Sequence, residues 1–185
     1  MLSYRVPRPG SSRIIRAATS RTRANQLISR VAELEAQPVT HVPWFERKCD
    51  GFTKVADSVE LAQAIESGKH SNKVVAVEFL AGWCSSCKGS YPALCKLTKD
   101  PRLNSNVLFY KANIEEESLF GWVKQHEVRG LPHMAVFSPS GELLIGLSSS
   151  NKKMAQVKAG LHTILDRPDC RRFGLDPQFN VIAKD

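Results

Sequence analysis

The chain has 185 residues, of which 42% are hydrophobic, so it is long and apolar enough to bury the core of one ordinary domain. Its formal net charge of +8 comes from one end, because residues 1–30 hold seven arginines and no acidic residue. The remainder has 19 Lys and Arg against 18 Asp and Glu, which excludes a strongly basic domain of the kind that binds nucleic acid.

The N-terminal arm, residues 1–40, is rich in Arg, Ser and Thr. We interpret it as an organelle transit peptide and linker, because it lacks the apolar run of a secretory signal or a membrane span. A disordered arm that binds RNA or anionic surfaces by charge is the alternative. The composition suits a chloroplast and a mitochondrion equally, and we place the cleavage point between about residues 25 and 42. No transmembrane segment is expected elsewhere.

Hydrophobic periodicity after the arm predicts an alternation of strands and helices. KVVAVEFL (73–80) is a continuous apolar run, typical of a strand buried on both faces. NVLFYKANI (106–114) has the period of two of a further strand. The other predicted elements are a lead-in helix or coil over 42–49, a strand over 51–55, helices over 57–68, 87–100, 115–128 and 151–165, and two strands joined by a turn within 134–147. Asp57 or Ser58 would cap the helix over 57–68, and Gly68 would end it.

The resulting order is β-α-β-α-β-α-β-β-α, which predicts an α/β domain with a central mixed sheet flanked by helices. We expect this domain to cover residues 41–168, and we expect residues 169–185 to be a C-terminal tail. The helix over 87–100 contains Pro92, which predicts a kink. The sequence has no internal repeats.

Two cysteines that are three residues apart, Cys84 and Cys87, follow the 73–80 strand in the stretch AGWCSSCK. The spacing alone is compatible with half a zinc site, a structural disulfide or a redox couple. Zinc is disfavoured because the chain has neither a second CxxC nor a pair of closely spaced histidines. In the first turn of a helix, the two sulfurs can bond, and the helix dipole favours a thiolate at Cys84. We predict that Cys84 is the nucleophile and that Cys87 resolves the mixed disulfide; a static disulfide is the alternative.

A CxxC that begins a helix after the second strand of this order resembles the thioredoxin family. VVAVEFLAGWCSSCK is similar to the family's strand, tryptophan and active-site turn, and RGLPHMAVFSPSGELL is similar to its proline loop and terminal hairpin. The resemblance covers about residues 50–166. The stretches PWFERK, YPALCK and NIEEE are most similar to the chloroplast atypical Cys/His-rich thioredoxins of plants and algae. The resemblance implies the thioredoxin fold and a protein-disulfide reductase that needs no metal and no organic cofactor.

Four further site residues follow from the resemblance. Glu78 interrupts the apolar 73–80 strand and takes the place of the family's buried acid, so we expect it to shuttle a proton for Cys87; a glutamate leaning into solvent is the alternative. Pro132 is expected to be a cis-proline, with an ordinary trans-proline at the start of a strand as the alternative. The backbone of Leu131 would bind an extended substrate peptide. Trp83 would dock partner proteins, unless it packs in the core.

The other three cysteines lie outside the CxxC. Cys95 is eight residues after Cys87 on the predicted helix, which is too far for a bridge to it. We therefore expect Cys95 to be a buried free thiol, with regulatory oxidation as the alternative. Cys49 and Cys170 lie in flanking segments, and the sequence suggests no role for either.

The site departs from the common thioredoxin pattern at two places. Ser85 and Ser86 stand where the family most often has Gly-Pro, and we predict a couple that is less reducing than the roughly −270 mV of thioredoxin. Ser148 and Ser149 stand near the place of the glycine that usually follows the last strand, which leaves the substrate-loop contacts there open. Lys88 beside the CxxC would support the Cys84 thiolate, but a solvated helix residue is the simpler interpretation.

We therefore expect a thiol–disulfide oxidoreductase that acts on protein disulfides or dithiols, with peroxiredoxins or light-regulated plastid enzymes among its targets. A reductase or glutathione would be its redox partner, and the protein would be a monomer that binds no nucleic acid. The expected location is the chloroplast stroma, with the mitochondrion as the alternative. A non-catalytic binding or chaperone module with the same fold is the alternative function.

Overall fold

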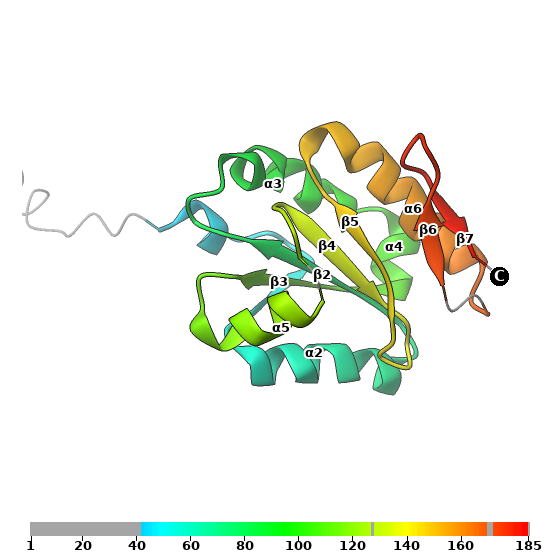
Figure 1. Cartoon of the computed structure of the whole chain (residues 1–185), viewed down its shortest axis with the longest axis horizontal. Helices are drawn as coiled ribbons and strands as arrows, with labels where there is room; N and C mark the ends of the chain where they lie inside the picture. Colours follow the sequence, from blue (N-terminus) through cyan, green and yellow to red (C-terminus); the bar gives the residue numbers. More distant parts are fainter. Residues whose placement is uncertain (1–41, 127, 170–171, 185) are drawn as a thin grey trace, which may run out of the picture. The chain divides into compact units, whose positions relative to one another are not determined.

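The computed structural model describes residues 42–126, 128–169 and 172–184, and its elements carry the labels of Figure 1. The N-terminal arm lies outside these residues, so the transit peptide stays a prediction. The residues from Val42 onward form one unit by their mutual contacts. In the part of the chain that the structure describes, no helix is long and apolar enough to cross a membrane.

A five-stranded mixed sheet forms the centre of this unit (Figure 1). Its spatial order is β1-β3-β2-β4-β5, with β1, β3 and β2 parallel to one another and β4 and β5 antiparallel to their neighbours. This arrangement confirms the predicted α/β architecture. The strands are β1 (Phe52–Val55), β2 (Val74–Leu80), β3 (Val107–Asn113), β4 (His133–Phe137) and β5 (Leu143–Ser148).

The central strand β2 is buried along its whole length, as its apolar run predicts. Because successive side chains of a strand point to opposite faces, β2 contributes to two hydrophobic clusters. Val74 and Ala76 pack in the cluster that contains Leu94 of the helix α3 (Ser85–Leu97). Val75 and Val77 belong to the cluster on the other face. Residue 78 is therefore on the α3 face of the sheet.

Helices cover both faces of the sheet. In Figure 1, α2 and α5 lie below the sheet, and α3 and α6 lie above it. Leu103 of α4 packs in the same cluster as Leu94 of α3. The helix predicted over 115–128 is shorter than expected, because Gly121 and its aromatic neighbours are weak helix formers. The helical segments are η1 (Trp44–Glu46), α2 (Ser58–Ser71), α3 (Ser85–Leu97), α4 (Pro101–Asn106), η2 (Glu117–Leu119), α5 (Phe120–Gln125), η3 (Asn151–Lys153) and α6 (Met154–Asp166).

The helix α2 begins as predicted and ends later than predicted. The Asp57 carboxylate accepts hydrogen bonds from two backbone N–H groups of the first turn, which confirms it as the N-cap. Gly68 does not end the helix but lies inside it, where a Cβ would stand 2.6 Å from Val75 Cγ2. Asn72 ends the helix in the left-handed conformation, with φ of 53°. The glycine therefore serves close packing on β2 and not termination.

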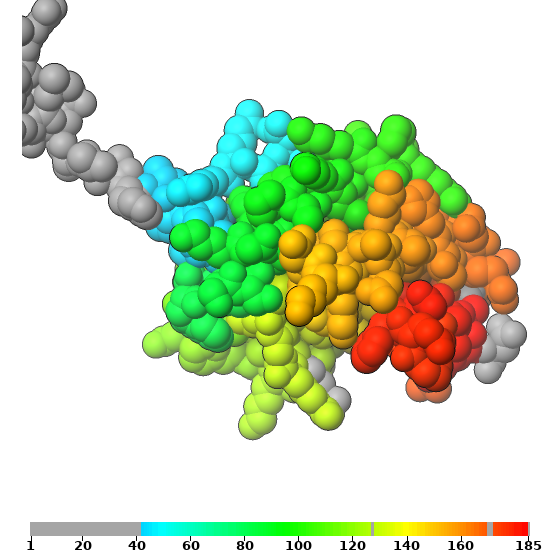
Figure 2. Space-filling view, turned by 90° about the horizontal axis from the view of Figure 1, so that it is seen from above, coloured from blue at the N-terminus to red at the C-terminus, as the bar shows by residue number. Residues whose placement is uncertain are grey.

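The C-terminal residues contain a small sheet where we expected only a tail. Its two antiparallel strands are β6 (Phe173–Leu175) and β7 (Val181–Ala183). Val181 packs so closely on α6 that a Cβ at Gly160 would stand within 2.4 Å of its Cγ2. Figure 2 shows this hairpin in red beside the orange α6. The hairpin extends the core on the α6 side, since Phe173 and Val181 are both buried.

Candidate active site

The predicted pair of cysteines lies at the start of α3. Cys84 is the N-cap of this helix, and its Sγ accepts a hydrogen bond of 3.1 Å from the Cys87 backbone N–H. The two sulfurs form a disulfide, with the Cα atoms 5.3 Å apart. Cys84 keeps 6% of its surface exposed and Cys87 keeps 2%, so Cys84 is the more accessible residue. Since a helix N-terminus presents unpaired N–H groups, the reduced Cys84 sulfur is placed where a thiolate is stabilised.

Aromatic side chains surround the turn before this pair. Trp83 is 70% exposed, which rules out the core-packing alternative for it. Trp44 and Phe45 pack against the cluster that contains Cys84 and Cys87, and Trp44 Nε1–H donates a 2.9 Å hydrogen bond to the Gly82 carbonyl. The turn is therefore supported from one side by Trp44, while the Trp83 side chain stays exposed.

The loop before β4 brings Pro132 to the same place. The Leu131–Pro132 peptide bond is cis, which is the geometry that the family resemblance implies. Leu131 packs against the cluster of Cys84 and Cys87, so the loop and the disulfide are neighbours. The Pro132 carbonyl accepts a hydrogen bond of 3.2 Å from the Ser149 N–H, and this bond ties the loop to the end of β5. The part of Leu131 in substrate binding stays a prediction.

Glu78 lies inside the protein and not at its surface. Its side chain is 1% exposed, so the alternative of a glutamate leaning into solvent is wrong. Ser149 Oγ donates a 2.8 Å hydrogen bond to Glu78 Oε1. Burial raises the pKa of Glu78 to about 8, and the Ser149 hydrogen bond opposes this rise. The carboxyl is therefore mostly protonated at neutral pH, and it is able to give or accept a proton at a pH slightly above neutral.

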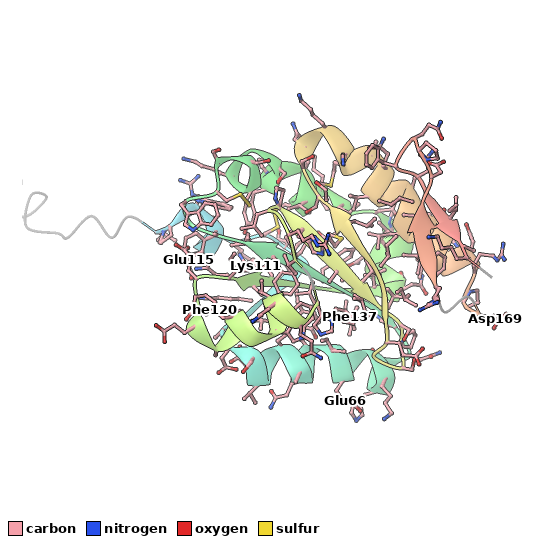
Figure 3. All side chains as sticks on the ribbon, in the orientation of Figure 1. Glu66, Lys111, Glu115, Phe120, Phe137 and Asp169 are labelled. Atoms are coloured by element: carbon pink, nitrogen blue, oxygen red, sulfur yellow. A yellow bond between two sulfur atoms is a disulfide. The ribbon has the colours of Figure 1, made fainter. Side chains whose placement is uncertain are left out.

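A buried lysine, which the sequence reasoning missed, accompanies Glu78. Lys111 of β3 is the register partner of Glu78, and it appears in Figure 3. Its Nζ donates hydrogen bonds to the carbonyls of Phe45 and Arg47 and to the Tyr91 hydroxyl. Burial lowers the pKa of Lys111. The only sign of a buried lysine in the sequence was its position in the middle of a predicted strand. Its partners could not be predicted, because they come from distant segments.

Lys88 is exposed on the outer face of α3, which fits the interpretation as a solvated residue. In the described residues, no group of three or more His, Cys, Asp and Glu side chains is arranged to hold a metal ion. The side chains that the site brings together for chemistry are two cysteines and one buried carboxyl.

The expectation of a free thiol at Cys95 is wrong, because Cys95 forms a disulfide with Cys49. The lead-in segment, residues 42–50, lies along α3 and brings Cys49 to it, as Figure 2 shows in blue to cyan beside green. Two hydrogen bonds accompany the bridge, from the Tyr91 hydroxyl to the Arg47 carbonyl and from Thr98 Oγ1 to the Asp50 carbonyl. Spacing alone gave no sign of this contact, since the two cysteines are 46 residues apart. Cys170 lies outside the described residues.

The family model, the related sequences and the solved structure that match this chain are all thioredoxins or thioredoxin-like proteins. The family model described as thioredoxin matches residues 53–162. A thioredoxin H4 of Arabidopsis thaliana is 31% identical over 99 residues, covering 54% of this chain and 79% of that protein. A chloroplastic thioredoxin-like 2 protein of Oryza sativa is 26% identical over 159 residues, covering 85% of this chain and 68% of that protein. The crystal structure of a poplar thioredoxin h superposes with a TM-score of 0.53 at 22% identity, over 63% of this chain and 97% of that one, which shows a shared fold.

Proposed function

The chain belongs to the thioredoxin family, and on this premise we propose that its Cys84/Cys87 dithiol exchanges electrons with protein disulfides. The observation that carries the proposal is the Cys84–Cys87 disulfide at the first turn of α3, packed beside the loop of the cis-proline. A non-catalytic binding or chaperone module has no need of two paired thiols at a helix N-terminus, and no observation favours it.

The reaction has two displacement steps. The Cys84 thiolate attacks one sulfur of a substrate disulfide, so that a mixed disulfide forms and one substrate sulfur leaves as a thiolate. In the molecules whose Glu78 is ionised, the Cys87 thiol then gives its proton to the Glu78 carboxylate and attacks the Cys84 sulfur, which releases the second substrate sulfur. The substrate gains two electrons, and the protein is left with the Cys84–Cys87 disulfide. Glu78 is suited to this transfer because the pKa of its carboxyl, about 8, is near that of a thiol.

Two neighbours of the disulfide would bind the substrate. Trp83 is exposed beside the reactive sulfur and offers a flat apolar surface for a partner protein. The backbone of Leu131 would hydrogen-bond an extended peptide next to Cys84. We infer that peroxiredoxins or light-regulated enzymes are among the targets, and that a reductase or glutathione reduces the Cys84–Cys87 disulfide back to the dithiol.

We place the protein in the chloroplast stroma. The support is the Arg-rich, acid-free composition of residues 1–30 together with the chloroplastic name of the rice relative. The subfamily resemblance to atypical Cys/His-rich thioredoxins agrees with this location. A fusion of residues 1–41 to a fluorescent protein tests it: accumulation in plastids supports the assignment, and accumulation in mitochondria overturns it.

Insulin reduction by dithiothreitol tests the activity, because the aggregation of reduced insulin is simple to follow. We expect the protein to accelerate the reaction and the Cys84→Ser variant to lose this acceleration. The matched control is a Cys49→Ala/Cys95→Ala variant, which removes the other disulfide and should keep the activity. Equal rates for the wild type and Cys84→Ser would refute the proposal.

A further inference from the structure

Ser149 links two parts of the site, the Glu78 side chain of β2 and the cis-proline loop before β4. It directly follows β5 and is 0% exposed. Its Oγ donates to Glu78 Oε1 at 2.8 Å, and its backbone N–H donates to the Pro132 carbonyl at 3.2 Å. A hydroxyl that is completely buried and bonded to a buried acid is a specific arrangement, because each of these polar groups is costly to bury without its partner.

The two oxygens of the Glu78 carboxyl are not equivalent. Oε1 is occupied by Ser149, whereas Oε2 is buried and has no hydrogen-bond partner in the part of the chain that the structure describes. A neutral carboxyl carries one O–H donor, and an ionised one only accepts. Since the Ser149 hydroxyl donates to Oε1, the proton of the neutral acid belongs on Oε2. Ser149 thus decides which oxygen of Glu78 is available for proton exchange.

The charged and titratable groups around Glu78 do not replace Ser149 in this role. Lys111 of β3 faces Glu78 in register, but its hydrogen bonds go to two carbonyls of the lead-in segment and to Tyr91 of α3. The β4 partner in register is Met134, and its neighbour His133 points to the other face of the sheet, toward Phe79. On α3, Cys87 lies on the buried face of the helix together with Leu94, which packs on the same face of the sheet as Glu78.

We propose that Ser149 is a positioning residue, which holds Glu78 by Oε1 so that Oε2 exchanges the proton with Cys87. When the disulfide forms, Cys87 loses its proton to Oε2, and the Ser149 hydroxyl stabilises the carboxylate until the exchange is complete. When the disulfide is opened by an incoming thiolate, the Oε2 proton returns to the Cys87 sulfur as the S–S bond breaks. This role rests on the proposed function of the Cys84/Cys87 pair.

The first test is the titration of Glu78 in the oxidised protein, followed by the NMR chemical shift of its carboxyl carbon. Loss of a charge-assisted hydrogen bond destabilises the carboxylate, so Ser149→Ala should raise the pKa of Glu78 by about one unit, or roughly tenfold in its dissociation constant. Ser149→Gly removes the same hydroxyl and should also raise the pKa of Glu78. Ser148→Ala is the matched control, because Ser148 is adjacent and exposed, and should leave the midpoint in place.

The second test is the pH profile of insulin reduction. The Ser149→Ala variant should move the profile in the same direction as the titration, and it should cause no further shift in a Glu78→Gln background, because Ser149 acts through Glu78. An unchanged Glu78 midpoint in both Ser149 variants, or an equal shift of the profile in the Gln background, would overturn the proposal. If the wild type fails to reduce insulin, the proposed function fails, whereas the NMR titration still decides whether Ser149 controls Glu78.

Discussion

Replacing both Cys49 and Cys95 with alanine removes the bridge between the lead-in segment and α3 and leaves the Cys84–Cys87 pair intact. The bridged cysteines are 46 residues apart. Closing a loop of that length in the unfolded chain removes conformational entropy worth roughly 4 kcal/mol at 25 °C. The double variant should therefore be less stable than the oxidised wild type by about this amount.

Urea unfolding at neutral pH measures the effect, with and without dithiothreitol. Without reductant, the variant should unfold at a clearly lower urea concentration with a similar slope. With reductant, the wild type loses the same bridge, so the two proteins should differ by less than about 1 kcal/mol, which reflects packing at the two sites. Hydrogen bonds from Tyr91 and Thr98 still fasten the lead-in segment, so the variant should stay folded.

A variant as stable as the oxidised wild type would show that the bridge does not form in solution or does not constrain the unfolded chain. A difference that persists in dithiothreitol would show that the alanines act by disturbing packing. Either result would refute the reasoning from loop closure.

Two further variants test the buried titratable side chains of Glu78 and Lys111. Glu78 holds a proton in the folded protein that it loses in the unfolded chain between its ordinary pKa of 4.5 and its folded pKa of about 8, so stability should fall as pH rises within this window. From pH 6.5 to 8 the oxidised wild type should lose roughly 1.5 to 2 kcal/mol relative to Glu78→Gln, in which this loss is absent. Burial lowers the pKa of His126 and His133, and the resulting gain in stability with pH is common to both proteins, so their difference isolates Glu78. An equal change of stability in both proteins would contradict the account. Lys111→Met should cost about 1 to 2 kcal/mol in urea unfolding, because the partly buried Phe45 carbonyl and Tyr91 hydroxyl lose the hydrogen bonds that the amine donates, whereas the Arg47 carbonyl keeps the one from Tyr91. A cost under about 0.5 kcal/mol would mean that water replaces the amine.

Local sequence patterns were sufficient to predict most of the fold. The apolar run of β2 indicated a strand buried on both faces, and Asp57 marked the start of α2. The end of α2 was predicted wrongly because Gly68 is a common stop signal, whereas here it makes room for Val75 of the sheet. The C-terminal hairpin was missed because strands of three residues carry too little periodicity to be recognised.

In the site, the residues joined by a local motif were predictable, and those joined only by the fold were not. Cys84 and Cys87 are three residues apart, so their disulfide followed from the sequence. Cys95 was expected to be a free thiol, since its partner is distant in the chain and no pattern pairs them. Ser149 is 71 residues from Glu78, and a serine after a strand has no signature that identifies a buried acid as its partner.

The reactivity of Cys84 in the reduced protein tests the central claim most directly. Brief alkylation with iodoacetamide at several pH values, followed by mass mapping of each cysteine, measures the fraction of thiolate at Cys84 and Cys87 separately. We predict that Cys84 is modified first and rapidly at pH 7, with an apparent pKa below the ordinary 8.5 of a cysteine. Slow modification of Cys84 near neutral pH, or modification of Cys87 before it, would contradict the assignment of Cys84 as the nucleophile.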